Sequence, residues 1–172
     1  MMKTVLKYGA GIAAALAVVT LLVIHVIGIE YGWARWFLML APVPVLFISL
    51  LMGINEQKKF YYQNEINYSQ ALFSGILISA FGTVLLLMFN IIYHSLNKNF
   101  ADEVIAVILP EMKNLSYSEE QQKEYITQIR NTYTLQGQVS SAFMMLITGI
   151  VFSAILAAFI RNKDTFTQVF KK

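Results

Sequence analysis

Four long stretches without a charged residue constrain this chain more than any other feature. Each holds 19 to 23 residues with no Asp, Glu, Lys or Arg, and together they make up 84 of the 172 residues. A helix rises about 1.5 Å per residue and the hydrocarbon core of a bilayer is about 30 Å thick, so each stretch is long enough to cross it. We expect four membrane-spanning helices, at residues 9–29, 36–54, 71–93 and 140–160.

The composition excludes the common soluble classes. Apolar residues make up 57% of the chain and charged residues 13%, whereas a soluble domain carries about 45–50% and about 25%. A disulfide-stapled secreted module is excluded because the chain has no cysteine. The basic residues behind the net charge of +3 form no single patch, so we expect no nucleic-acid partner. The expected fold is one all-α membrane domain over residues 1–172, a four-helix bundle in contact with the lipid bilayer.

The first stretch has one competing interpretation, a signal peptide, because Lys3 and Lys7 precede it. Its length exceeds the 7–15 apolar residues of a signal peptide, and no small-residue cleavage site follows residue 29. We therefore expect an uncleaved span.

The lysines and arginines predict the orientation. With four spans, eight of the thirteen fall on one side of the membrane and five on the other. The richer side is normally cytoplasmic, so we expect both termini in the cytoplasm and the long loop, residues 94–139, outside. The eight are Lys3, Lys7, Lys58, Lys59, Arg161, Lys163, Lys171 and Lys172.

Small residues at four-residue spacing predict how the spans pack, since helices in lipid associate where their backbones approach closely. Spans one, three and four each carry such a row, and we expect these three at the bundle centre. Pro42 and Pro44 predict a kink or a frayed start in span two, which either shapes that helix or lines a transport cavity. The rows are Gly9, Ala13 and Ala17; Ala71, Gly75, Ser79 and Thr83; and Gly149, Ser153 and Ala157.

The long loop predicts two helices that lie on the outer leaflet or dock on the bundle. Asn99 can cap the first, with Asp102 and Glu103 in its first turn, and Pro110 should end it. Either Ser116 with Glu119 or Ser118 with Gln121 fits a capping box for the second. Gly137 is the expected break before span four. The second helix has an apolar face made of Tyr125, Ile126, Ile129 and Tyr133.

Few groups could carry chemistry. His25 is either hydrogen-bonded to another helix or reaches to the surface, His94 is expected to be solvated, and Asn90 is either an interhelical hydrogen-bond partner or a substrate ligand. His25, Glu30 and His94 are the candidate acid–base groups of a membrane enzyme. The two histidines with Glu30, Asp102 and Glu103 are the candidate metal ligands. No catalytic motif accompanies them, so we expect no catalytic residue, no metal and no cofactor.

Several short motifs suggest a family. They are Lys7-Tyr8-Gly9, Ile66-Asn67-Tyr68-Ser69-Gln70-Ala71-Leu72 with Gly75, Phe89-Asn90-Ile91-Ile92-Tyr93, and Arg161-Asn162-Lys163. Over nearly its whole length the chain resembles a family of bacterial four-span membrane proteins described as domain of unknown function 4199. Where that family has Tyr-Arg after span two, this chain reads Lys58-Lys59-Phe60-Tyr61-Tyr62-Gln63. The resemblance implies four helices in a bacterial inner membrane and supplies no activity and no catalytic residue.

Three classes of function fit these observations. The leading hypothesis is a non-catalytic scaffold or accessory subunit that acts through its packing faces and outer loop, on another membrane protein or on a second copy of itself. The alternative is a small transporter or channel component, and the third is an enzyme at the membrane interface.

Overall fold

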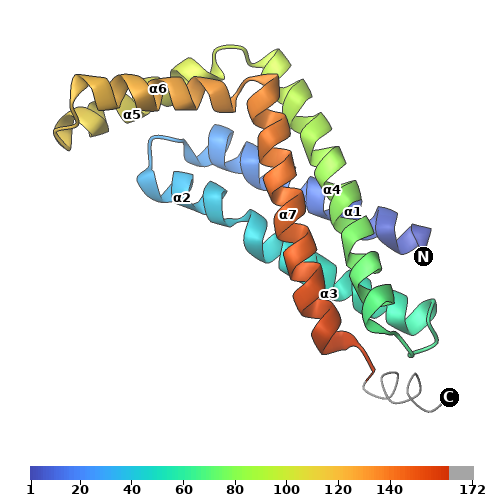
Figure 1. The fold of residues 1–172 in the computed structure, drawn as a ribbon. Helices are drawn as coiled ribbons and strands as arrows, with labels where there is room; N and C mark the ends of the chain where they lie inside the picture. Colours follow the sequence, from blue (N-terminus) through green and yellow to red (C-terminus); the bar gives the residue numbers. More distant parts are fainter. Residues whose placement is uncertain (163–172) are drawn as a thin grey trace.

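The computed structural model describes residues 1–162, and Figure 1 shows them as an assembly of helices. Within these residues, four helices or broken helix pairs are long and apolar enough to cross a membrane, which confirms the predicted spans and the all-α membrane fold. Lys163, Lys171 and Lys172, which the orientation prediction counts, lie outside the described residues. The elements are α1 (Met2–Leu22), the π-helix η1 (Val23–Ile27), α2 (Gly32–Leu40), α3 (Pro42–Phe60), α4 (Tyr68–Leu96), α5 (Phe100–Asn114), α6 (Glu119–Thr132) and α7 (Leu135–Ile160).

Span two is a pair of helices, and its prolines shape the joint. α2 ends at Leu40 and α3 begins at Pro42, so this proline occupies the first helical position of α3. A missing N–H costs nothing there, because the first amides of a helix have no partner within the helix. Ala41 between them donates its N–H to the Phe37 carbonyl at 2.8 Å. The predicted effect of the prolines is confirmed as a break between α2 and α3.

α4 lies at the centre of the bundle and packs against α7, α1 and α3, and Figure 1 shows α7 and α4 side by side with α1 passing behind them. Every member of the predicted α4 row is buried, from Ala71 to Thr83. A Cβ atom at Gly75 would overlap the Ser153 side chain of α7, and one at Gly9 would lie 3.1 Å from the Gly82 backbone nitrogen. The prediction is confirmed for α4 and for the contacts that α1 and α7 make with it, but it wrongly leaves out span two, because α3 packs against α1, α4 and α7 and buries Leu46, Leu50 and Ile54.

One end of the bundle gathers the start of α1, the α3–α4 turn and the end of α7, and we call it the terminal end. Tyr62 in the turn donates its hydroxyl to the Met1 sulfur at 3.8 Å. The backbones of Ile66 and Asn162 are joined by an N–H to carbonyl bond of 3.0 Å, and Lys58 donates to the Ile160 carbonyl at 2.9 Å. Segments far apart in the sequence thus close this end.

At the opposite end, α5 and α6 form a helical hairpin that projects sideways from α4 and α7 (Figure 1), and we call it the arm. Asn99 is the N-cap residue of α5 as predicted, although its side chain makes no capping bond. The second helix starts at the Ser118–Gln121 capping box. Ser116 instead adopts a left-handed backbone, with φ of 57°, in the turn before it.

Two predicted helix ends in the arm are wrong. α5 continues through Pro110 to Asn114. The carbonyl that loses its partner belongs to Ala106, which is exposed, and the last turn is held by the buried side chain of Met112 and the ion pair of Glu111. The break before span four lies at Thr134 and not at Gly137, which is inside the first turn of α7.

Gly137 nevertheless makes this break feasible. A Cβ atom at residue 137 would overlap the backbone oxygens of Asn131 and Thr132 at the end of α6. Only a residue without a side chain lets α7 start so close to α6.

Candidate functional site

A groove with a volume of about 330 Å³ lies on the arm side of the bundle, between the α2–α3 pair and the helices α4 and α7. Its size is at the lower end of the range for small-molecule sites, about 300–1,000 Å³. Its walls are mainly aliphatic side chains and methionines. They are Met39, Pro42, Val43 and Leu46, then Leu86, Leu87 and Asn90 of α4, and Ser141, Ala142, Met144, Met145 and Thr148 of α7.

A second cavity of about 320 Å³ lies between α2 and the arm. Met39 lines both cavities, so they adjoin. The second cavity contains an ion pair, in which Arg35 of α2 contacts Glu111 of α5 with 2.5 Å between Nη2 and Oε2. The other guanidinium nitrogen of Arg35 donates to the Ile29 carbonyl at 2.9 Å. The remaining walls are Gly32, Trp36, Ile108 and Tyr125.

Asn90 faces the first cavity, and the prediction that it bonds another helix is wrong. Its side-chain amide makes no hydrogen bond within residues 1–162, and the residue is partly exposed. Of the other polar groups in the groove, Thr148 satisfies its hydroxyl on the Met144 carbonyl of its own helix, at 3.0 Å. Among residues 1–162, the Asn90 amide and the exposed Ser141 hydroxyl are therefore the groove's open hydrogen-bonding groups, and Asn90 is the one on α4.

His25 makes the interhelical contact expected of it. Its Nε2 lies 3.1 Å from the hydroxyl of Tyr93 on α4. The bond ties the π-helix at the end of α1 to the bundle centre.

His94 is not solvated as predicted. Its ring packs against Tyr133 with 5.0 Å between ring centroids and against Phe100 at 5.5 Å, and its Nδ1 is buried without a partner among the described residues. Burial raises the pKa of the Tyr133 phenol, and the nearby Tyr93 adds to the shift. This aromatic cluster of Tyr93, His94, Phe100 and Tyr133 fixes the arm to the end of α4.

The candidate acid–base groups are not assembled into one site. His25 and His94 each contact Tyr93, but no contact joins Glu30 to either histidine within residues 1–162. Asp102, proposed as a metal ligand, pairs instead with Arg130 of α6 at 3.1 Å. Across the part of the chain that the structure describes, no group of three or more potential ligands could hold a metal ion.

Sequence reasoning missed a polar network at the terminal end. Glu56 of α3 accepts from Lys7 Nζ at 2.6 Å, from the Tyr8 hydroxyl at 2.8 Å and from the Thr4 hydroxyl at 3.4 Å. Beside it, Gln57 is fully buried and accepts from the Ser74 hydroxyl at 2.7 Å.

A signal for this network was present. Leu46, Leu50 and Ile54 follow a helical spacing that reaches the core face again near residue 57. Span two was expected to end at residue 54, because Glu56 follows as the first charged residue. Residue 57 was therefore not counted as part of the buried row.

Comparison with known families supports the motifs found in the sequence. A family model described as "Protein of unknown function (DUF4199)" matches residues 7–162. No curated protein and no solved structure matches the chain.

Proposed function

The chain belongs to the family described as protein of unknown function (DUF4199), and on that premise we propose that it is a non-catalytic scaffold or accessory subunit of a bacterial inner membrane. The arm, α5 with α6, is the element through which it contacts a partner protein of the same membrane. Family membership brings no activity with it, so the proposal depends on this chain's own geometry.

The observation that carries the proposal is an arm that is firmly anchored and yet uncovered. Phe100 and Val104 of α5 are buried, and Arg35 holds the end of that helix through Glu111. α6, in contrast, has no buried residue. A helix of 14 residues is marginal alone in water, so an anchored helix with an open face is suited to receive a partner.

The charges of the arm favour a basic partner surface. Between residues 100 and 133 the chain has six acidic residues and three basic ones, although the whole protein carries a net charge of +3. Complementary charge steers association and discriminates among partners more than it adds affinity.

The same features favour a non-catalytic role over an enzyme. No contact joins Glu30 to either histidine within residues 1–162, so the described contacts do not support a proton relay among His25, Glu30 and His94. A small transporter or channel component remains the alternative. It would need a polar path across the membrane, whereas the groove between the spans is mainly apolar.

The proposed orientation places both termini in the cytoplasm and the arm outside. The start of α1 and the end of α7 lie at the same end of the bundle, together with Lys58 and Lys59. Reporter fusions after residue 65, within the arm and after residue 172 test it. A periplasmic reporter that is active at the C-terminus would contradict it.

The scaffold role is tested by site-specific photocrosslinking in cells. A photoreactive residue replaces Glu120 on α6, and the control replaces Phe159, which is 83% exposed on the spanning part of α7. We expect one discrete protein adduct from residue 120, lost when Glu119 and Glu124 are changed to Lys, and none from residue 159. Absence of any protein adduct from α6 would contradict the proposal.

A further inference from the structure

The two adjoining cavities change from polar beneath the arm to apolar between the spans. A bilayer leaflet changes in the same order, from its head groups to its acyl chains. The cavity beneath the arm holds the Arg35–Glu111 ion pair with Trp36 and Tyr125, residue types that favour the membrane interface. The cavity between the spans is mainly aliphatic. An amphiphile with its head group under the arm and its tail between the helices would match both environments.

The depth of the groove agrees with this. Asn90 lies six residues before the end of α4, or about 9 Å along the helix, and Thr148 lies 13 residues after the start of α7, or about 20 Å. The groove therefore occupies the half of the hydrocarbon core nearer the arm. Met39 and Met144 on its rim are 69% and 60% exposed, so the groove opens at the side of the bundle, where the lipid chains would lie.

The charged groups identify the class of head group. Within residues 1–162, Arg35 uses two of its hydrogen-bond donors, on Ile29 and Glu111, and its guanidinium has five. The free donors match a phosphate, and the Glu111 carboxylate matches an ammonium group. Because the pair is neutral as a whole, it suits a head group carrying both charges better than an anionic one.

We propose that the two cavities form one binding site for a zwitterionic glycerophospholipid of the leaflet nearer the arm. Its phosphate and ammonium lie at Arg35 and Glu111, and one acyl chain fills the groove between α3, α4 and α7. Asn90 supplies a donor for an ester carbonyl. Flexible methionine walls adapt to an acyl chain better than branched side chains would.

The test is native mass spectrometry of the full-length protein in detergent, with dioleoyl phosphatidylethanolamine and dioleoyl phosphatidylglycerol as probes. We expect one retained phosphatidylethanolamine per chain, preferred over phosphatidylglycerol by roughly tenfold, the effect of one charge-assisted contact. Equal retention of both lipids would mean ordinary annular lipid and would overturn the proposal.

A matched pair of variants locates the acyl chain. Ala142→Trp fills the groove, whereas Ala158→Trp makes the same change on the exposed surface of α7 outside it. We expect the first to lose the bound lipid and the second to keep it. Equal binding by both variants would contradict the site. A dimer that excludes lipid and is broken by Ala142→Trp alone would assign the groove to a second copy of the chain.

Glu111→Lys tests the head group without relying on simple loss of binding. The cavity would then carry two positive charges, so we expect the preference to reverse toward phosphatidylglycerol. A variant that merely loosened the arm would lose both lipids alike. An unchanged preference for phosphatidylethanolamine in Glu111→Lys would contradict the assignment of the head group.

Discussion

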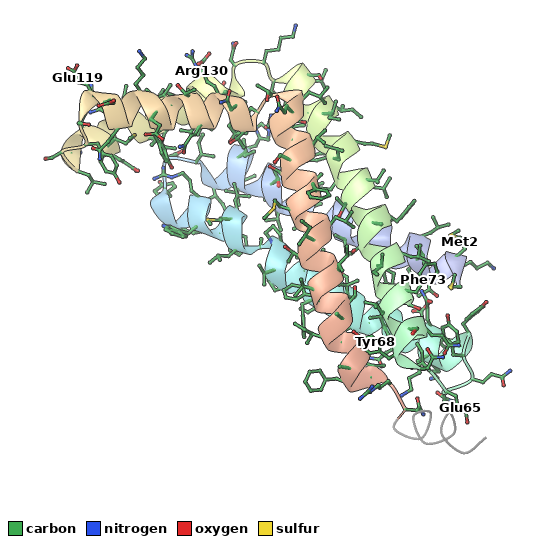
Figure 2. The ribbon with its side chains drawn as sticks, viewed as in Figure 1. Met2, Glu65, Tyr68, Phe73, Glu119 and Arg130 are labelled. Carbon is green, nitrogen blue, oxygen red and sulfur yellow. The ribbon has the colours of Figure 1, made fainter. Side chains whose placement is uncertain are left out.

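The terminal end and the arm end of this bundle are built differently, although α4 and α7 run between them. At the terminal end, Glu56 joins α1 to α3, and Asn162 joins the end of α7 to the α3–α4 turn. At the arm end the groove between the spans adjoins the cavity beneath the arm, and the Arg35–Glu111 pair lies across the second of these. Figure 2 shows Tyr68 and Glu65 at the first end and Glu119 and Arg130 on the arm at the other. The contrast supports our proposal that the arm end is the binding end, since binding regions are drawn from the less stable parts of a fold.

The largest effect is expected from Gly75→Leu, which breaks the contact between α4 and α7. The new side chain would overlap Ser153, and overpacking of this kind costs about 1–3 kcal/mol. We expect a clear fall in Tm in detergent. Gly11→Leu is the control, since nothing lies within 4 Å of a Cβ at that position. Equal Tm values for the two variants would show that the α4 row does not hold the bundle together.

Ser74→Ala tests how much the buried polar network contributes to the stability of the terminal end. It removes the only hydrogen bond that the structure gives the buried side chain of Gln57 within residues 1–162, which should cost about 1 kcal/mol in a membrane. Adding Gln57→Leu should recover much of the loss, because no polar group then stays buried and unpaired. Two additive losses of Tm in the double variant would contradict this account.

Ile129→Asp acts on the arm alone. Ile129 is half-buried on the inner face of α6, whereas Thr127 is exposed, so Thr127→Asp serves as the control. We expect trypsin to cut Ile129→Asp faster near Lys123 and Arg130, with little change in the Tm of the bundle. If the wild type is already cut as fast as Ile129→Asp, the arm is not anchored and the proposed scaffold surface loses its support.

The smallest effect is a pH dependence at the base of the arm. Burial raises the pKa of Tyr133 above its ordinary value of 10.0, so the folded state favours the neutral phenol. The stability this contributes is complete below pH 10 and is lost as the pH rises through the raised pKa. We expect the wild type to lose more Tm between pH 8.5 and 10.5 than Tyr133→Phe does. Parallel losses in the two proteins would show that the phenol stays solvated.

Much of the fold could be predicted because its strongest signals are local. Span number depends on uncharged length, and the packing faces depend on small residues four apart, as the buried row from Ala71 to Thr83 shows. The helix break at Pro42 likewise follows from the chemistry of one residue.

The features that could not be predicted depend on contacts between distant segments. α5 continues past Pro110 because Arg35, far earlier in the chain, holds its last turn. Asn90 was expected to find a partner helix, but the α2–α3 joint leaves a groove in front of it. Glu56 lies just beyond the predicted span and becomes part of the core network only because α1 brings Lys7 and Tyr8 beside it.

The difference between the two ends is tested most directly by amide hydrogen exchange at the two capping boxes. Asn67–Gln70 at the terminal end and Ser118–Gln121 on the arm make the same pair of local hydrogen bonds. The residue before the first box, Ile66, is 1% exposed, whereas Tyr117 before the second is 45% exposed.

Any difference in protection between the boxes therefore reports their packing. We predict that the amides of Asn67 and Gln70 exchange at least about tenfold more slowly than those of Ser118 and Gln121, a difference of about 1.4 kcal/mol in opening free energy. Equal protection of the two boxes, or slower exchange on the arm, would contradict the division of the molecule into a closed terminal end and an open binding end.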